Sequence, residues 1–257
     1  MAEGRLSGRH ALVTGGGSGI GAAIARRFAA EGARLTLVGR RREPIRDLAG
    51  ELEGIAVSAD VTDPSAVERA FAEARAGNGP LSILVANAGA GSSAPFEKLS
   101  LEDWRAAMAV NCEAVFHCCR AALPDLRAGA DGRIVAIAST AGLKGYAYAA
   151  HYVAAKHGAV GLMRALAIEL AETGITANAL CPGFTDTGMA AAAITNIADK
   201  TGRGEEEARA ALAEFNPQRR LIDPREVAEA ALWLCLPESR SVTGQAIAVA
   251  GGEVMCG

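Results

Sequence analysis

Short apolar runs rich in β-branched residues alternate with longer segments of helical period along this chain, and the alternation limits the folds open to it. Runs with almost no polar alternation are typical of strands in a parallel sheet covered on both faces, joined by helical crossovers. The pattern predicts strands at residues 10–13, 34–38, 55–58, 82–86, 133–138, 176–180 and 246–249, and helices near residues 19–31, 43–51, 64–75, 101–126, 152–172 and 224–236. The predicted fold class is therefore α/β, a doubly wound, Rossmann-like parallel sheet of about seven strands with helices on both faces.

The chain shows no linker, because it has no Pro/Ser-rich stretch, no low-complexity block and no shift in composition. Half of its 257 residues are apolar, which is enough to bury a sizeable core. Residues 1–257 are therefore expected to form a single domain. Residues 188–216 break the alternation, being Ala-rich and then charged. This segment is expected to form a lid over a ligand site at the carboxyl ends of the strands.

The net charge and the apolar content of the chain bear on its partners and its location. A net charge of −3 gives no electrostatic reason to expect nucleic acid or an anionic membrane as a partner. Residues 1–10 lack the apolar core of a signal peptide, and no stretch is long and apolar enough to span a membrane. We expect a soluble, cytoplasmic protein.

The cysteines and histidines argue against a metal site. The six cysteines are Cys112, Cys118, Cys119, Cys181, Cys235 and Cys256. Most fall within apolar runs, none has CxxC spacing, and the chain has four histidines. We expect no metal and reduced, buried thiols.

A glycine-rich turn lies between the first predicted strand and the first predicted helix, within Thr14-Gly-Gly-Gly-Ser-Gly-Ile-Gly21. Glycines allow a tight turn and a close backbone approach, while a helix N-terminus offers N–H groups to a pyrophosphate. The segment therefore predicts a dinucleotide site, with Gly15, Ser18, Ile20 and Gly21 as candidate contacts. The alternative is a purely structural glycine turn.

A basic run, Arg40-Arg41-Arg42, follows the second predicted strand, where an NAD-preferring enzyme usually has an acid. A guanidinium binds phosphate oxygens in a bidentate way, so Arg40 and Arg41 favour NADP(H) over NAD(H). Arg40 is the better candidate because it comes first after the strand and Gly39 leaves room for a phosphate. The alternative is a solvated basic loop.

Tyr152 and Lys156 stand four residues apart in a predicted helix, so both project from one face. Hydride transfer to a ketone creates an alkoxide that needs a proton, and a nearby ammonium stabilises the phenolate of a tyrosine that gives one. Ser139, at the end of a predicted strand, can donate a hydrogen bond to the substrate oxygen. Tyr146 and Tyr148 have no lysine four residues on. The alternatives are an exposed helix pair and an ordinary strand-end hydroxyl.

Together these motifs resemble the short-chain dehydrogenase/reductase family in its common form of about 250 residues, over nearly the whole chain. The resemblance implies a nicotinamide-dependent oxidoreductase that acts on a ketone or secondary alcohol through Ser139, Tyr152 and Lys156. It implies that Asn111 holds a relay water, and that Tyr152 and Lys156 also contact the cofactor. It adds these candidate cofactor contacts: Asp60, Val61, Asn87, Ala88, Gly89, Pro182, Gly183, Thr185 and Thr187.

The substrate is to be chosen by the loop at residues 140–151 and by the lid. The candidate substrate contacts are Ser139, Lys144, His151, Tyr152 and Phe184, with Lys144 suited to an anionic group. His151 would bind an acidic or thioester substrate, or else is a surface residue at a helix start. The C-terminal stretch resembles the 3-oxoacyl reductase and 3-hydroxyacyl-CoA dehydrogenase branch, although Ala250 stands where that branch has aspartate. Dehydrogenation of a polyol, steroid or aromatic alcohol and a non-catalytic dinucleotide sensor remain alternatives.

Two predicted helices carry apolar residues over more of their circumference than one sheet face covers, which indicates burial on two sides. The residues are Ala106, Ala107, Val110, Val115, Phe116 and Cys119 on the first, and Val160, Leu162, Met163, Leu166 and Leu170 on the second. The family resemblance implies that these helices pack against their copies. We expect a homotetramer.

Overall fold

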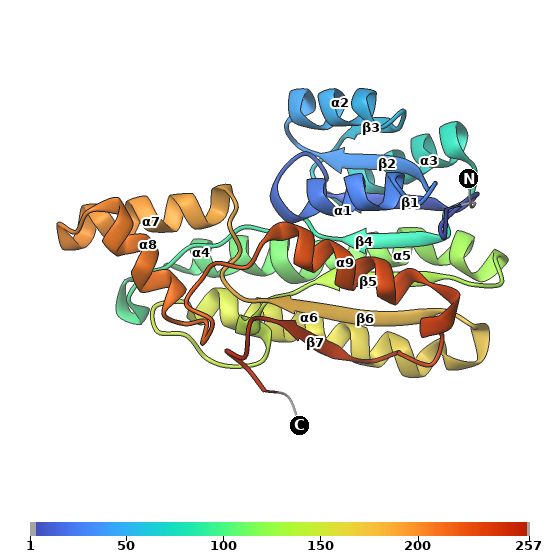
Figure 1. The fold of residues 1–257 in the computed structure, drawn as a ribbon. Helices are drawn as coiled ribbons and strands as arrows, with labels where there is room; N and C mark the ends of the chain where they lie inside the picture. Colours follow the sequence, from blue (N-terminus) through green and yellow to red (C-terminus); the bar gives the residue numbers. More distant parts are fainter. Residues whose placement is uncertain (1–3, 256–257) are drawn as a thin grey trace.

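Seven parallel strands form one sheet within residues 4–255, which are the residues that the computed structural model describes (Figure 1). The strands are β1 (His10–Thr14), β2 (Arg34–Gly39), β3 (Ile55–Ser58), β4 (Ile83–Ala86), β5 (Arg133–Ile137), β6 (Thr176–Pro182) and β7 (Ala246–Val249), in the order β3-β2-β1-β4-β5-β6-β7. In β1, Leu12 packs into the core on one face of the sheet while Ala11 and Val13 pack into the core on the other. The predicted fold class is confirmed.

Two helical layers cover the sheet (Figure 1). One layer contains α1 (Gly19–Ala29), α2 (Arg42–Glu51) and α9 (Pro224–Cys235), and the other contains α3 (Pro64–Asn78), α5 (Ala114–Ala128) and α6 (Ala150–Glu169). Asp63 and Asp223 cap α3 and α9, each with a proline in the first helical turn. Burial of both apolar layers is the main favourable contribution to folding.

The strand order changes direction at β1, and this change creates the site. The chain runs from β1 outwards to β2 and β3 and then returns to β4 on the other side of β1. The segments that follow β1 and β4 therefore diverge at the carboxyl ends of these strands, which leaves a crevice between them.

The segment predicted as a lid forms two helices, α7 (Gly188–Thr201) and α8 (Glu205–Ala213), which extend beyond the main body of the sheet (Figure 1). A small apolar cluster of their own joins them: Ala190, Ile194, Ala208, Leu212 and Leu221. The role of this segment as a lid stays a prediction.

The helix predicted over residues 101–126 is unbroken but is not α-helical throughout. It consists of α4 (Leu101–Met108), a π-helical turn at Ala109–Glu113 and then α5. The extra residue in a π turn shifts the register of the helix by one position, which the apolar pattern of the sequence did not show. Such turns are frequent at functional sites, and this one carries Asn111.

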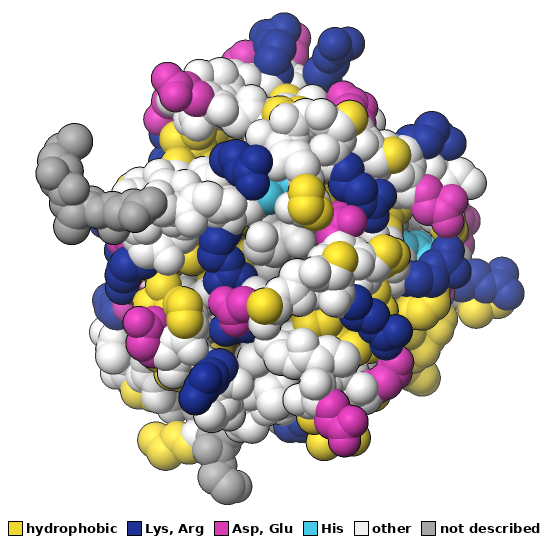
Figure 2. Space-filling model, turned by 90° about the vertical axis from the view of Figure 1, so that its right-hand side faces the viewer, with side chains coloured by type: hydrophobic (Ala, Val, Ile, Leu, Met, Phe, Trp, Pro, Cys, Tyr) yellow, Lys and Arg dark blue, Asp and Glu magenta, His cyan; other side chains and the backbone are white. Residues whose placement is uncertain are grey.

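Four of the described cysteines, Cys118, Cys119, Cys181 and Cys235, are buried, Cys112 is partly exposed, and Cys256 lies outside the described residues. Burial raises the pKa of the Cys118 and Cys235 thiols to about 12, so both stay protonated at neutral pH. Figure 2 shows the face of the molecule turned away from α7 and α8, where basic and acidic side chains are interspersed.

Candidate active site

The glycine-rich turn joins β1 to α1 and is closely packed. Gly15 and Gly19 have φ angles of 63° and 53°, in the left-handed region that favours glycine. A Cβ atom added to Gly21 would lie 2.3 Å from the carbonyl oxygen of Gly15, so no larger residue fits there. Within the described chain, the side chain of Ser18 makes no capping bond to the start of α1. The Ser18 side chain therefore leaves the first backbone N–H groups of α1 available to an anionic ligand.

Asn87, just after β4, holds this turn in place. Its side-chain amide donates hydrogen bonds to the carbonyl oxygens of Thr14, at 2.9 Å, and Gly15, at 3.2 Å. The hydroxyl of Thr14 accepts bonds from the backbone N–H groups of Asn87 and Ala88, both at 3.0 Å. The crevice between β1 and β4 is thus rigidly bounded on this side.

A cleft of about 420 Å³ lies beside the turn. It is lined by Gly15, Gly17, Ser18, Gly39, Arg40, Arg41, Pro44, Ile45, Ala59, Asp60, Val61, Ala88, Gly89 and Val110. Many of these are predicted cofactor contacts, so the structure brings the glycine turn, the basic run and the segments after β3 and β4 to one space. Pro44, Ile45 and Val110 were missed, because small apolar side chains outside a motif carry no signal of their own. The cleft has room for part of a dinucleotide.

Arg40 lies at the edge of this cleft with its side chain 71 % exposed, and its guanidinium is 4.0 Å from the carboxylate of Asp60. Asp60 accepts hydrogen bonds from the backbone N–H and the hydroxyl of Thr62. Chiefly through the backbone bond, these contacts lower the pKa of Asp60. Arg40 therefore keeps most of its hydrogen-bonding capacity for a ligand.

Ser139 and Tyr152 meet at the end of β5. The oxygen of Ser139 accepts a hydrogen bond from the backbone N–H of Ala141 at 3.1 Å, so its own O–H is available to another acceptor. Burial raises the pKa of Tyr152, while a hydrogen bond with Ser139 acts in the opposite direction. The net direction is opposite to the lowering that the spacing of Tyr152 and Lys156 suggested. Tyr152 is therefore a protonated phenol at neutral pH, which suits a proton donor.

Lys156 is buried beneath Tyr152. Its ammonium lies 5.7 Å from the centre of the Tyr152 ring and donates a hydrogen bond to the carbonyl oxygen of Ile137 at 2.9 Å. Burial lowers its pKa to about 8. The predicted pair is therefore on one face of α6, and the exposed-helix alternative is wrong for this lysine.

Asn111 and Lys156 both lie close to Gly89. A Cβ atom added to Gly89 would lie 2.8 Å from Asn111 Oδ1 and 3.5 Å from Lys156 Nζ. The amide of Asn111 donates to the carbonyl oxygens of Ala107, at 3.1 Å, and Ala90, at 2.9 Å. The π turn thus aims Asn111 at the glycine of the segment after β4, beside the lysine.

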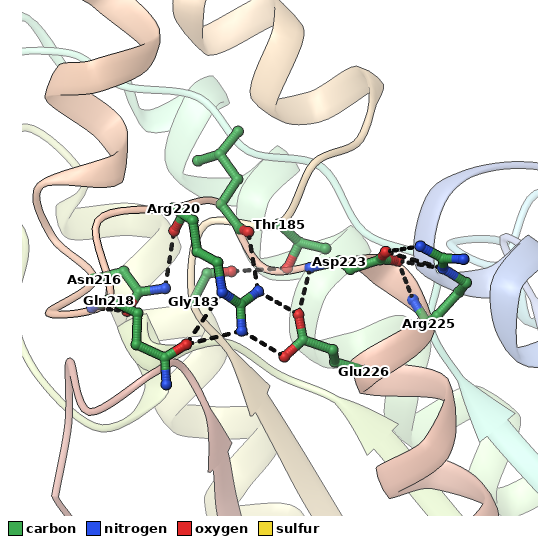
Figure 3. A network of polar contacts seen from close by, with 9 residues as sticks. Gly183, Thr185, Asn216, Gln218, Arg220, Asp223, Arg225 and Glu226 are labelled. Atoms are coloured by element: carbon green, nitrogen blue, oxygen red, sulfur yellow. Dashed lines mark hydrogen bonds and ion pairs between the residues drawn. The ribbon is translucent and has the colours of Figure 1, made fainter.

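The segment after β6 is joined to the chain that returns from α8 by backbone hydrogen bonds of Phe184 and Asp186 with Ile222. The hydroxyl of Thr185 donates to the carbonyl oxygen of Gly183 at 2.9 Å, and Thr187 lies against Gly19 of the glycine turn. Figure 3 shows Arg220 held between Gln218 and Glu226, and Asn216 bonded to the carbonyl oxygen of Arg220. Thr187 therefore reaches the turn that the cleft borders, whereas Pro182, Gly183 and Thr185 lie further along the same edge.

The substrate candidates Lys144 and Phe184 surround Tyr146. The Lys144 ammonium is 3.1 Å from the carboxylate of Glu253, and the Tyr146 ring packs edge-on against the Phe184 ring with centres 6.1 Å apart. Lys144 is therefore paired within the chain, and its contact with an anionic group of the substrate stays a prediction. Glu253 was missed because no motif links the C-terminal segment to this loop.

His151 is 1 % exposed, so the alternative of a surface residue is wrong. Its Nε2 atom is hydrogen-bonded to the Ser92 hydroxyl at 2.7 Å, while Nδ1 has no partner among residues 4–255. A direct contact between this side chain and the substrate stays a prediction.

Among residues 4–255, no group of three or more His, Cys, Asp or Glu side chains is placed to hold a metal ion. In the same part of the chain, no helix has the length and apolar character that a membrane crossing requires.

The comparisons with known proteins agree on one family. The family model described as short chain dehydrogenase matches residues 9–198. A D-beta-hydroxybutyrate dehydrogenase of Cupriavidus necator is 37% identical over 255 residues, covering 97% of this chain and 99% of the relative. A variant of the actinorhodin polyketide ketoreductase, crystallised with NADPH, superposes with a TM-score of 0.93 at 38% identity, covering 98% of this chain and 99% of that one. The 3-ketoacyl-(acyl-carrier-protein) reductase of Brucella melitensis, crystallised with NADH, gives a TM-score of 0.89 at 32% identity and covers 97% and 100%.

Proposed function

Because this chain belongs to the short-chain dehydrogenase family, we propose that it reduces the keto group of a 3-oxoacyl thioester with NADP(H), using Ser139, Tyr152 and Lys156. The coarser activity follows from the family and its relatives: the protein is a nicotinamide-dependent oxidoreductase of ketones and secondary alcohols. What we propose beyond this activity is that the substrate is a 3-oxoacyl thioester and that the cofactor is NADP(H).

One arrangement supports the proposal above all others: a protonated, half-buried Tyr152 lies between the Ser139 hydroxyl and the buried Lys156 ammonium. A non-catalytic dinucleotide site has no need of these three groups together. The glycine turn, the cleft and Arg40 also suit the pyrophosphate and ribose of a nicotinamide dinucleotide, so the residues present fit the cofactor.

When bound, a reduced nicotinamide would supply a hydride to the ketone carbon, and negative charge would develop on the ketone oxygen. The Ser139 hydroxyl would donate a hydrogen bond to this oxygen as the charge forms. The Tyr152 phenol would give up its proton to it, since its raised pKa keeps that proton available at neutral pH. The Lys156 ammonium would stabilise the phenolate that remains. Asn111 would hold a water beside Lys156 for return of the proton.

Arg40 decides the cofactor in this proposal. Arg40→Asp is expected to shift preference from NADPH towards NADH, because it exchanges a phosphate partner for an acceptor of ribose hydroxyl groups. The lost charge-assisted contact contributes about 1.5 to 3 kcal/mol, or more than about tenfold in the ratio of the two kcat/KM values. Arg42→Asp, the same charge change at the start of α2, is the control and should leave the ratio unchanged. A wild-type enzyme that already prefers NADH contradicts the assignment of Arg40.

A screen with both cofactors tests the substrate. Acetoacetyl-CoA, a polyol, a steroid ketone and an aromatic ketone are compared by the absorbance of the reduced cofactor. We expect the highest kcat/KM for acetoacetyl-CoA with NADPH. A clear preference for any of the other compounds contradicts the thioester proposal but leaves the oxidoreductase activity intact.

We propose a homotetramer whose interface includes α5 and α6. Phe116 is 45% exposed and Ile168 is 82% exposed, while Leu162 and Leu166 are partly exposed. The sequence also pointed to Val115, Cys119, Val160, Met163 and Leu170, but these are buried in the core of the subunit itself. Fewer apolar residues therefore face outwards from these two helices than the sequence predicts.

We also propose that the protein is located in the cytoplasm.

Phe116→Arg and Leu166→Arg are expected to dissociate the tetramer, because each places an unpaired charge in an apolar contact at a cost of several kcal/mol. Light scattering after size-exclusion chromatography measures the mass. Ala72→Arg, at an exposed position of α3, is the control. A wild-type protein that is monomeric at micromolar concentration would leave the exposed Phe116 and Ile168 without the proposed role.

A further inference from the structure

Glu253 brings a carboxylate from the C-terminal segment into the substrate loop. Its side chain is 1% exposed. Its Oε1 atom accepts a hydrogen bond from the Tyr146 hydroxyl and forms an ion pair with the Lys144 ammonium. The Tyr146 hydroxyl is also hydrogen-bonded to Thr140, the residue after Ser139, at 2.6 Å. The ion pair of Lys144 and Glu253 is therefore linked, through Tyr146 and Thr140, to the chain beside Ser139.

The second oxygen of this carboxylate, Oε2, is buried and has no hydrogen-bond partner among residues 4–255. A Cβ atom added to Gly183 would lie 2.8 Å from it, so it borders the segment that follows β6. A buried acceptor without a donor is unfavourable, and it repels any further anion that approaches.

The Lys144 ammonium contacts two groups of this chain. Its ammonium has the Glu253 carboxylate at 3.1 Å and the face of the Tyr146 ring at 4.9 Å. A substrate carboxylate would have to displace Glu253 from it and leave that buried carboxylate without its counter-charge. The Glu253 side chain is 1% exposed and that of Lys144 is 35% exposed. Loss of its counter-charge is costly for a buried carboxylate, so Glu253 competes with an approaching anion for the charge of Lys144.

Three aromatic rings pack together beside the pair of Lys144 and Glu253. The Tyr146 ring lies 6.1 Å from the Phe184 ring and 5.9 Å from the Phe215 ring, and Phe184 and Phe215 are 5.2 Å apart between ring centres. Such a surface binds apolar groups well and gives no compensation for an unpaired charge.

We propose that the Lys144–Glu253 pair makes the substrate pocket selective for ketones whose reacting end is uncharged, such as 3-oxo esters and thioesters, and unfavourable to free 3-oxo acids. Glu253 is then a specificity-determining residue. The inference rests on the proposed function and extends it, since it separates thioester substrates from the free acid named in the hydroxybutyrate dehydrogenase relative.

Acetoacetate and methyl acetoacetate test this inference, because they present the same keto group and differ in the charge at the carboxyl end. For the wild-type enzyme with NADPH, we expect kcat/KM for the ester to exceed that for the acid by at least about tenfold. Glu253→Gln frees the Lys144 ammonium and should reduce this ratio about tenfold, through a lower KM for acetoacetate. In the double variant Glu253→Gln/Lys144→Gln the ratio should return towards the wild-type value. A merely structural role of Glu253 would instead lower activity on both substrates alike.

Each contrary result overturns the inference. These are a wild-type enzyme that reduces both compounds equally well, a folded Glu253→Gln variant with an unchanged ratio, and a double variant that keeps the gain. If Glu253→Gln does not fold, as judged by circular dichroism, Glu253→Leu removes the charge and the buried acceptor together and is read in the same way. A wild-type enzyme inactive on acetoacetyl-CoA and on methyl acetoacetate with both cofactors contradicts the proposed function itself. One that reduces acetoacetyl-CoA yet prefers acetoacetate to its ester contradicts the selectivity alone.

Discussion

Tyr152→Phe is expected to reduce kcat for ketone reduction by at least about 10²-fold, and by up to about 10⁴-fold, because general acid catalysis contributes an effect of this size. The ring, its packing and the position of Lys156 remain, so the fold and the affinity for the cofactor should be nearly unchanged. Steady-state kinetics measures the first effect, and cofactor fluorescence measures the second.

Tyr146→Phe is the matched control for this variant. Tyr146 is a second phenol, hydrogen-bonded to the residue after Ser139, and burial together with its bond to Glu253 raises its pKa far above the ordinary value. Its loss should change substrate selectivity more than kcat. If Tyr152→Phe keeps more than about a tenth of the wild-type kcat, or if Tyr146→Phe is the more damaging change, then Tyr152 is not the proton donor.

Lys156→Met is expected to lower kcat by about 10²-fold or more, because the phenolate of Tyr152 loses the cation beside it. The same variant should weaken cofactor binding, as the family resemblance implies a contact between this lysine and the nicotinamide ribose. Its effect should also depend on pH. Burial lowers the pKa of Lys156 from 10.5 to about 8, so the ammonium is lost as the pH rises through about 8. Wild-type reduction should therefore decline above that pH.

The pH profile of Lys156→Met supplies the check. It should lack the decline near pH 8 that we expect of the wild type. Lys98→Met, at an exposed position, is the control and should keep both the rate and the profile of the wild type. An unchanged kcat in Lys156→Met, with the cofactor bound, would show that this lysine takes no part in the reaction.

The strands could be predicted because buried parallel strands leave a direct record in the sequence as uninterrupted apolar runs. The i, i+4 spacing of Tyr152 and Lys156 likewise fixed their common face. The π turn at Asn111 could not be predicted, since one residue more per turn leaves the composition of the helix unchanged. The hydrogen-bond partner of the buried His151 is Ser92, 59 positions earlier in the chain, and no pattern in the sequence links the two.

Contacts between distant residues account for most of what the sequence missed. Glu253 meets Tyr146, which precedes it by 107 positions, and no motif announces that contact. Charge alone assigned Lys144 to an anionic ligand, whereas tertiary packing provides its partner within the chain. Val115 was expected at an interface because a single helix cannot show which of its apolar residues the subunit's own core already covers.

Transfer of deuterium from the cofactor to the product tests the central claim most directly. The enzyme is incubated with acetoacetyl-CoA and with NADPH labelled with deuterium at C4 of the nicotinamide ring on either face, and the product is examined by mass spectrometry. We predict one deuterium per molecule at the carbinol carbon from one of the two labelled cofactors, and no labelled product from Tyr152→Phe within the same time. A wild-type protein that binds NADPH but forms no deuterated product from either label would contradict the account.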